Sequence, residues 1–105
     1  MNHEKEDKLN IKNFLEEEKV SDIRAYNNGE WINIVVGTVR SQRHISGILK
    51  KIKVLKIIKK EDVFGIPENE WVICSVEGID IHLFTKEKRD YYGIDNLWEQ
   101  WQYEQ

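Results

Sequence analysis

The chain has 105 residues and a mass of 12.6 kDa, a length that suits one domain and leaves no room for a second hydrophobic core. Sixteen Lys and Arg against nineteen Asp and Glu give a formal net charge of −3, which excludes a protein that binds polyanions over its whole surface. The single cysteine, Cys74, excludes an internal disulfide and a zinc-binding cysteine set, and no run approaches the roughly 18 apolar residues that a membrane span needs.

The chain opens with polar residues of mixed charge, which we interpret as a tail (residues 1–8) ahead of one domain (residues 9–105). This opening lacks the apolar segment of a secretion signal and is too acidic for an organelle transit peptide. We therefore expect a cytoplasmic protein of a prokaryotic cell, with an organelle matrix as the alternative location.

Residues 9–19 carry apolar side chains near helical spacing, which predicts a first amphipathic helix. Asn27-Asn28-Gly29 is typical of a turn. The run from Trp31 to Val36 is rich in β-branched and aromatic residues and predicts a strand.

The next segment, residues 40–60, carries eight basic residues and no acidic one. Ser41 is well placed to cap a helix in this segment. Lysines around such a helix suit either a solvent-exposed face or contact with RNA phosphates, and both explanations remain open here. The apolar residues of the helix fall on one stripe and are Ile45, Ile48, Leu49, Ile52 and Leu55.

The most informative stretch runs from Trp71 to Phe84, where Glu77-Gly78 suits a two-residue hairpin turn. Pairing the strands around that turn separates their side chains onto two faces. The first face is apolar, is predicted to pack on helices, and consists of Val72, Cys74, Val76, Ile79, Ile81 and Leu83. The second face mixes aromatic and polar residues and consists of Trp71, Ile73, Ser75, Asp80, His82 and Phe84.

Two explanations of this mixed face remain open. It is either a docking platform for a partner, or it is covered by the aromatic C-terminal segment between Tyr91 and Trp101 folding back over it. Both predict an α/β fold with a small mixed β-sheet and helices packed on one face. An open apolar sheet face would also allow the free protein to form a homodimer.

The sequence contains no recognisable catalytic or metal-binding pattern. His3, His44 and His82 lie far apart and outside any metal-binding spacing, and Cys74 lies on the predicted core face, where an inert thiol is typical. No closely spaced pair of carboxylates is present. We therefore expect a non-enzymatic binding protein without catalytic residues, cofactor or metal. A strand followed by Gly37 and a helix resembles nucleotidyltransferases, which leaves a degenerate nucleotidyltransferase-like enzyme as the alternative.

Several motifs identify a family resemblance over about residues 19–98. Ser41-Gln42-Arg43-His44 opens the basic helix, Asp22-Ile23 stands near the expected end of the first helix, and Gly65 precedes Trp71. The run Trp71-Val72-Ile73 is followed by Ile81-His82-Leu83-Phe84 and then by Arg89, Tyr92, Leu97 and Trp98 at matching spacing. Together these residues resemble the ribosomal silencing factor family, also called RsfS or Iojap.

This resemblance implies the nucleotidyltransferase-like Iojap fold and a non-enzymatic function. Members of the family bind the large ribosomal subunit at ribosomal protein uL14 and block its association with the small subunit, which represses translation. Organellar relatives assist large-subunit biogenesis. An RNA-binding module that uses the basic helix of residues 40–60 remains a further alternative.

The resemblance also indicates which residues meet the partner. Arg43, Lys50 and Lys53 are expected near ribosomal RNA phosphates, and for Arg89 a structural ion pair with Asp80 or Asp95 is the alternative to a partner contact. The expected ribosomal-protein-binding residues are Trp71, Ile73, His82, Phe84, Arg89, Tyr92, Leu97 and Trp98.

Five positions at four sites depart from the usual pattern of the family. Val39 replaces a glycine, Ser75 replaces an aspartate, Glu77-Gly78 replaces a Gly-Asp turn, and Phe64 replaces a glutamate. We expect these changes to affect contacts with the partner rather than the fold.

Overall fold

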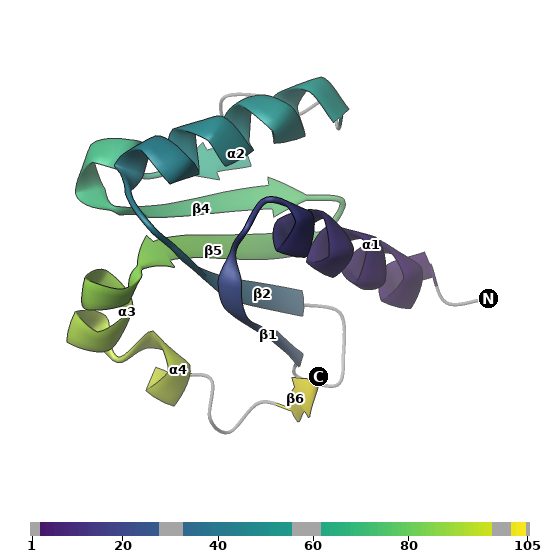
Figure 1. Cartoon of the computed structure of the whole chain (residues 1–105). Helices are drawn as coiled ribbons and strands as arrows, with labels where there is room; N and C mark the ends of the chain where they lie inside the picture. Colours follow the sequence, from purple (N-terminus) through teal and green to yellow (C-terminus); the bar gives the residue numbers. More distant parts are fainter. Residues whose placement is uncertain (1–2, 28–32, 56–61, 98–101, 105) are drawn as a thin grey trace.

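The structure, a computed structural model, describes residues 3–27, 33–55, 62–97 and 102–104. Within these ranges one six-stranded sheet has the strand order β3-β4-β5-β2-β1-β6, and Figure 1 shows its arrangement with the helices. Along the chain the elements are α1 (His3–Glu17), β1 (Ser21–Asn27), β2 (Asn33–Val39), α2 (Gln42–Leu55), β3 (Val63–Phe64), the 3₁₀ helix η2 (Pro67–Asn69), β4 (Trp71–Val76), β5 (Ile79–Thr85), α3 (Lys86–Tyr92), α4 (Ile94–Leu97) and β6 (Gln102–Glu104).

The sheet is mixed, as predicted, because β2 pairs in parallel with β5 while β4 pairs with β5, and β1 with β2, in the antiparallel direction. Helices α1 and α2 pack on one face and form the larger core there. On the other face α3 and α4 follow directly from the end of β5 (Figure 1), where Ile94 joins a smaller core with Val36 and Phe84. The predicted α/β class is therefore confirmed.

The hairpin of β4 and β5 has the predicted register at all six pairs, from Trp71 opposite Phe84 to Val76 opposite Ile79. Glu77 and Gly78 both adopt positive φ angles, 52° and 82°, as a two-residue hairpin turn with right-handed strand twist requires. Every residue of the predicted apolar face is buried.

Helix α2 also matches its prediction, with one exception. The Ser41 hydroxyl accepts a hydrogen bond from the backbone N–H of His44 at 3.2 Å, which caps the helix. Leu55 is 64% exposed rather than buried, because it is the last residue of the helix and lies beyond its buried turns. The buried residues of the predicted stripe are Ile45, Ile48, Leu49 and Ile52.

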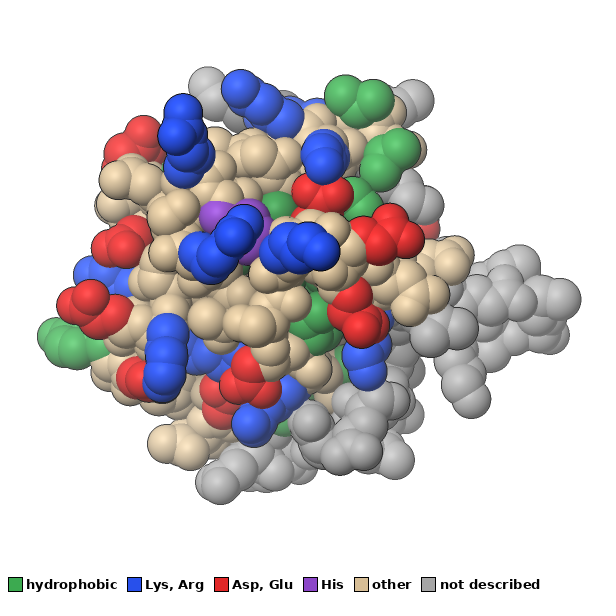
Figure 2. Space-filling view, viewed as in Figure 1, with side chains coloured by type: hydrophobic (Ala, Val, Ile, Leu, Met, Phe, Trp, Pro, Cys, Tyr) green, Lys and Arg blue, Asp and Glu red, His purple; other side chains and the backbone are tan. Residues whose placement is uncertain are grey.

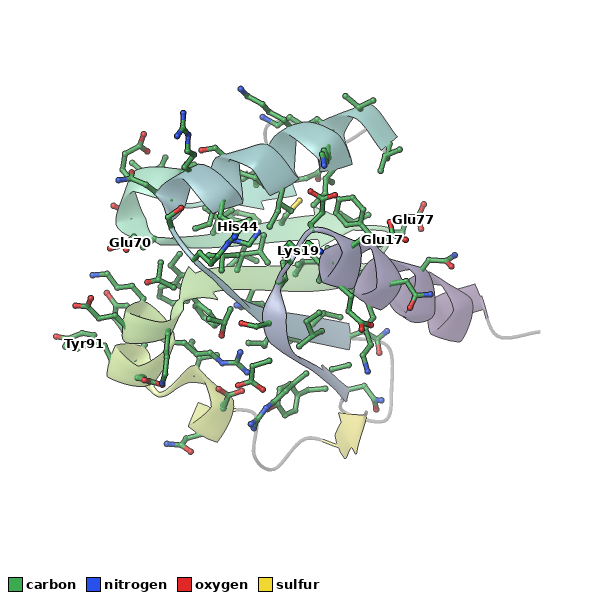
Figure 3. The ribbon with its side chains drawn as sticks, in the orientation of Figure 1. Glu17, Lys19, His44, Glu70, Glu77 and Tyr91 are labelled. Carbon is green, nitrogen blue, oxygen red and sulfur yellow. The ribbon has the colours of Figure 1, made fainter. Side chains whose placement is uncertain are left out.

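The motif at the start of α2 has a structural function. His44 Nδ1 accepts a hydrogen bond from the backbone N–H of Arg40 at 3.0 Å, so its Nε2–H donates to the carbonyl oxygen of Glu18 at 2.6 Å. Figure 3 shows His44 beneath α2, toward the end of α1. The side chain therefore ties the end of α1 to the start of α2.

The first helix begins earlier than predicted. Residues 9–19 were expected to be helical, whereas α1 starts at His3, inside the expected polar tail, and ends at Glu17. The periodic apolar signal begins only at Leu9, but the preceding Glu and Lys residues are themselves good helix formers. Lys19 then takes a left-handed φ of 67°, which ends the helix.

The residue pattern predicted no strand before Trp31, and Asp22-Ile23 was wrongly placed near a helix end. Both residues lie in β1, where the pairing with β2 is irregular between Ser21 and Arg24. Such a bulge interrupts the alternation that reveals a strand in a sequence. The predicted turn was Asn27-Asn28-Gly29. Asn27 is the last residue of β1, and Asn28 and Gly29 lie outside the described ranges.

The second strand is shifted relative to its prediction. Residues 31–36 were expected, whereas β2 runs from Asn33 to Val39, and Trp31 lies outside the described ranges. Gly37 was expected to end the strand but lies within it. A glycine is needed at this position because a Cβ would come 2.4 Å from Cγ1 of Val20. In the described part of the chain, no helix is both long and apolar enough to cross a membrane.

Candidate functional site

The mixed face of the sheet is divided into a covered part and an open part. Over the covered part, α3 and α4 turn back from the end of β5, with Thr85 capping α3 by accepting the N–H of Lys88. Phe84 beneath them is completely buried. Its predicted role as an accessible anchor for a partner is therefore wrong, because the C-terminal segment packs over it.

His82 is also buried, with a neighbouring ring, Phe84, at 6.4 Å between centroids. Burial lowers the pKa of His82 to about 4, an effect that the charge of Asp80 only partly offsets. The imidazole is therefore neutral near pH 7. Its expected contact with a partner has no support in this arrangement, since the side chain lies within the fold.

Arg89 lies at the centre of a buried polar cluster and is only 4% exposed. Its Nε and Nη2 donate to the two carboxylate oxygens of Asp95 at 2.8 and 3.0 Å. Nη1 donates to the carbonyl oxygen of Asp22 at 2.7 Å and to the hydroxyl of Thr38 at 2.8 Å. Of the two interpretations of Arg89, the structural ion pair with Asp95 is confirmed, and we call this group the Arg89 cluster.

The Arg89 cluster fixes the C-terminal helices to the sheet. The Tyr26 hydroxyl donates to Asp95 at 2.9 Å, so residues of β1, β2, α3 and α4 meet at one point. The hydrogen bonds from Arg89 and Tyr26 lower the pKa of Asp95 despite its burial. Arg89 therefore positions α3 from inside the fold and is not exposed to a partner.

The open part of the mixed face forms a groove between the β3–η2 loop, β4 and α3, with a volume of about 430 Å³. Within it, the rings of Trp71 and Tyr92 lie 4.9 Å apart at an angle of 41°. Tyr92 is 47% exposed and Phe64 is 57% exposed. The residues that line this aromatic groove are Phe64, Gly65, Glu68, Asn69, Glu70, Trp71, Ile73, Lys88 and Tyr92.

Local backbone geometry holds the loop wall of the aromatic groove in place. Gly65 has a φ of 86°, and a Cβ there would lie 2.6 Å from the carbonyl oxygen of Trp71. Glu70 takes a left-handed φ of 58°, and its carbonyl oxygen accepts the N–H of Thr85 at 3.2 Å. Only glycine can approach the Trp71 carbonyl oxygen this closely with the φ of Gly65. The backbone is therefore fixed at Gly65, and Phe64, the preceding residue, is held beside β4.

The aromatic groove and the basic helix present different chemistry. Glu68, Glu70 and Lys88 give the groove a slightly acidic rim, and Figure 3 shows Glu70 and Tyr91 on the same side of the molecule. Lys and Arg side chains are prominent in the upper part of Figure 2, where Figure 1 places α2.

The structure thus brings together only some of the expected partner-binding residues. Trp71, Ile73 and Tyr92 line one groove, whereas Leu97 is described only as part of α4, and Trp98 lies outside the described ranges. The groove is also lined by residues that were not among those expected, namely Phe64, Glu68 and Lys88. For Phe64 a signal was available, since an aromatic residue replaces the glutamate that is usual in the family.

Little in the described part of the chain suggests catalysis or metal binding. No three His, Cys, Asp or Glu side chains among the described residues could hold a metal ion together. Burial raises the pKa of the Cys74 thiol to about 11, so the thiol is protonated near pH 7. The features that distinguish the aromatic groove are therefore its shape and its aromatic side chains.

Comparisons with known proteins agree with this fold. The family model described as "Ribosomal silencing factor during starvation" (RsfS) matches residues 2–105. A ribosomal silencing factor RsfS of Zymomonas mobilis is 27% identical over 70 residues, which make up 62% of this chain and 51% of that protein. A mitochondrial ATPase synthesis protein 25 of Clavispora lusitaniae is 40% identical over 35 residues, 33% of this chain and 6% of that protein. The chain thus spans about half or less of these curated relatives.

Two solved structures share the architecture. A crystal structure from Chromobacterium violaceum superposes with a TM-score of 0.71 at 26% identity, covering 94% of this chain and 88% of that one. A crystal structure from Bacillus halodurans gives a TM-score of 0.64 at 23% identity, covering 82% of this chain and 87% of that one. The second likeness bears on the fold alone.

Proposed function

The chain belongs to the RsfS family of ribosomal silencing factors, and from this premise we propose that it binds the large ribosomal subunit and blocks association with the small subunit. The ribosomal protein contacted is uL14. The result is repression of translation, and the same contact suits a factor that assists large-subunit biogenesis. This function is non-enzymatic and needs no cofactor.

The observation that carries the proposal is the aromatic groove. Trp and Tyr are the residues that most often dominate the binding energy of protein interfaces, especially in well-packed hollows. The rings of Trp71 and Tyr92 meet at a tilted angle in such a hollow, and Phe64 extends it as an exposed wall. Because the Arg89 cluster and the Gly65 contact hold both walls, the partner meets a preformed surface and little ordering energy is lost on binding.

Blocking subunit association requires only that the protein occupies the surface where the subunits meet, and it needs no chemical reaction. The chain has principal extents of 36 × 31 × 25 Å, so a bound copy keeps the small subunit from packing against the covered area. The bound state must only outlast encounters between the subunits, which is a requirement on the dissociation rate.

A second, weaker contribution comes from α2. Arg43, Lys50 and Lys53 are exposed there and suit contact with ribosomal RNA phosphates next to the protein contact. Each phosphate neutralised adds a salt-dependent share to the affinity. The aromatic groove supplies the part of the affinity that does not depend on salt.

Sucrose-gradient co-sedimentation with purified ribosomal subunits tests the proposal. We expect the protein to migrate with the large subunit alone and to reduce the yield of joined ribosomes. Trp71→Ala and Tyr92→Ala should weaken co-migration by about tenfold or more, the loss expected for an aromatic anchor. Ile66→Ala is the control, since Ile66 is an exposed apolar residue that does not line the groove.

Two results would contradict the proposal. The first is absence of co-migration at low salt. The second is loss of binding in the Lys50→Ala, Lys53→Ala double variant while Trp71→Ala and Tyr92→Ala bind normally, which would favour an RNA-binding module instead.

A further inference from the structure

Three exposed cations surround the motif at the start of α2, for which the aromatic groove provides no function. They are Lys19, Arg40 and Arg43, and we call them the His44 patch. Lys19 follows α1, Arg40 lies between β2 and α2, and Arg43 is in the first turn of α2. The patch therefore collects positive charge from two segments that are distant in the chain.

His44 holds these two segments together. Its Nε2–H donates to the carbonyl oxygen of Glu18, which directly precedes Lys19, at 2.6 Å. Its Nδ1 accepts the backbone N–H of Arg40 at 3.0 Å. Figure 3 shows Lys19 beside His44, and in Figure 2 a purple imidazole lies among blue Lys and Arg side chains. Because both ring nitrogens are bonded, the backbone that carries the patch is held in one arrangement.

The charges of the His44 patch are not used inside the protein. Among the described residues, none of its three cations forms an ion pair. Glu18, the acidic neighbour of Lys19, is already paired with Lys51 at 2.8 Å. Lys86, an exposed cation on α3, is likewise paired with Asp90 at 2.8 Å. The patch is therefore a set of cations whose charge is available to an external anion.

We propose that the His44 patch binds the phosphate backbone of double-stranded RNA. Several cations fixed on one surface suit successive phosphates of a nucleic acid. Recognition of unpaired bases needs an aromatic platform, and the only ring in the patch is the imidazole of His44, whose nitrogens are both engaged. The contact is therefore to the backbone and independent of base sequence.

The His44 patch continues into the basic face of α2. Arg43 and Lys50 are seven residues apart on that helix, a spacing of about two turns that places them on one side. The inference deepens the proposed function and rests on it only for the identification of the RNA as ribosomal. Its new element is the contribution of Lys19 and Arg40, which were not among the residues expected near RNA.

Fluorescence anisotropy of a short fluorescein-labelled RNA duplex, titrated with the full chain at several salt concentrations, tests the proposal. Affinity should fall linearly with salt on logarithmic scales. The variants Lys19→Gln, Arg40→Gln and Arg43→Gln should each weaken binding by about threefold or more and reduce the salt slope by about one, the share of one phosphate. Lys86→Gln is the matched control, since it removes an exposed charge that Asp90 already neutralises, and it should bind like the wild type.

A second duplex of unrelated sequence should bind with equal affinity, and circular dichroism shows that each variant is folded. The proposal is overturned if the wild type does not bind RNA at low salt, if affinity depends strongly on base sequence, or if Lys86→Gln loses as much affinity as the patch variants. It is also overturned if only the Lys50→Ala, Lys53→Ala double variant loses affinity. Binding of the large subunit through the aromatic groove is measured separately with Trp71→Ala, so the two proposals fail or stand separately.

Discussion

The guanidinium of Arg89 and the carboxylate of Asp95 form a two-point ion pair, with Nε–Oδ2 and Nη2–Oδ1 distances of 2.8 and 3.0 Å. Arg89 lies on α3 and Asp95 on α4, and the same guanidinium also bonds to the ends of β1 and β2. This pair sets where α3 lies on the sheet. Tyr92, on the same helix, consequently meets Trp71 at 4.9 Å in the aromatic groove.

Removing Arg89 should strongly destabilise the fold. Arg89→Ala leaves the Asp95 carboxylate without its ion-pair partner, so we expect the free energy of unfolding to fall by about 3 kcal/mol. Arg89→Lys keeps the charge but loses the two-point geometry and should cost about 1–2 kcal/mol. Urea denaturation measures both. Lys86→Ala is the control, since Lys86 pairs with Asp90 at 2.8 Å in an exposed position and should leave the free energy of unfolding nearly unchanged. Equal losses at Arg89 and Lys86 would contradict this account.

Stability should depend on pH through His82. Its pKa is lowered to about 4 in the fold, against an ordinary value of about 6.5 in the unfolded chain. Between these values the unfolded state binds more protons, so stability falls as pH decreases from 7 to 4, by up to about 3 kcal/mol. The variant His82→Gln does not titrate and should flatten this part of the profile. Urea denaturation at a series of pH values checks the expectation, and an unchanged profile in the variant would refute it.

The hairpin and α2 could be predicted because their signals are local. The turn at Glu77-Gly78 fixes the register of every pair in β4 and β5, and the apolar stripe that follows Ser41 fixes the buried side of α2. The strand β1 could not be predicted from its residue pattern, since the irregular pairing between Ser21 and Arg24 removes the alternation on which such a prediction depends.

The candidate site was harder to predict than the fold for a different reason. Alternation places Trp71, His82 and Phe84 on one face, but which of them is covered depends on how α3 packs. That packing is decided by Arg89, whose partners Asp22 and Thr38 lie 67 and 51 residues away in the chain. A single sequence holds no signal for contacts of that range.

Phe64 should contribute to binding without contributing to stability. Phe64→Ala removes an exposed wall of the aromatic groove, and we expect large-subunit affinity to fall by about tenfold. The free energy of unfolding should change by less than about 0.5 kcal/mol, because the ring is 57% exposed. Ile66→Ala, at a similarly exposed position that does not line the groove, is the control. Titration of each variant against labelled large subunits gives the affinities, and equal binding by wild type and Phe64→Ala would remove Phe64 from the site.

Gly65→Ala should be costly, whereas the same change at Gly47 should be favourable. At Gly65 an added Cβ meets the carbonyl oxygen of Trp71 at 2.6 Å on a backbone with φ of 86°, so we expect a loss of about 2 kcal/mol in the free energy of unfolding. The loop wall must also move, which should weaken large-subunit binding. Gly47 lies within α2 with nothing within 4 Å of its added Cβ, so alanine should raise stability by about 0.5–1 kcal/mol through helix propensity. Thermal and urea denaturation should show a lower free energy of unfolding for Gly65→Ala and a higher one for Gly47→Ala. A change of the same sign in both variants would show that the close approach at Gly65 does not constrain the loop.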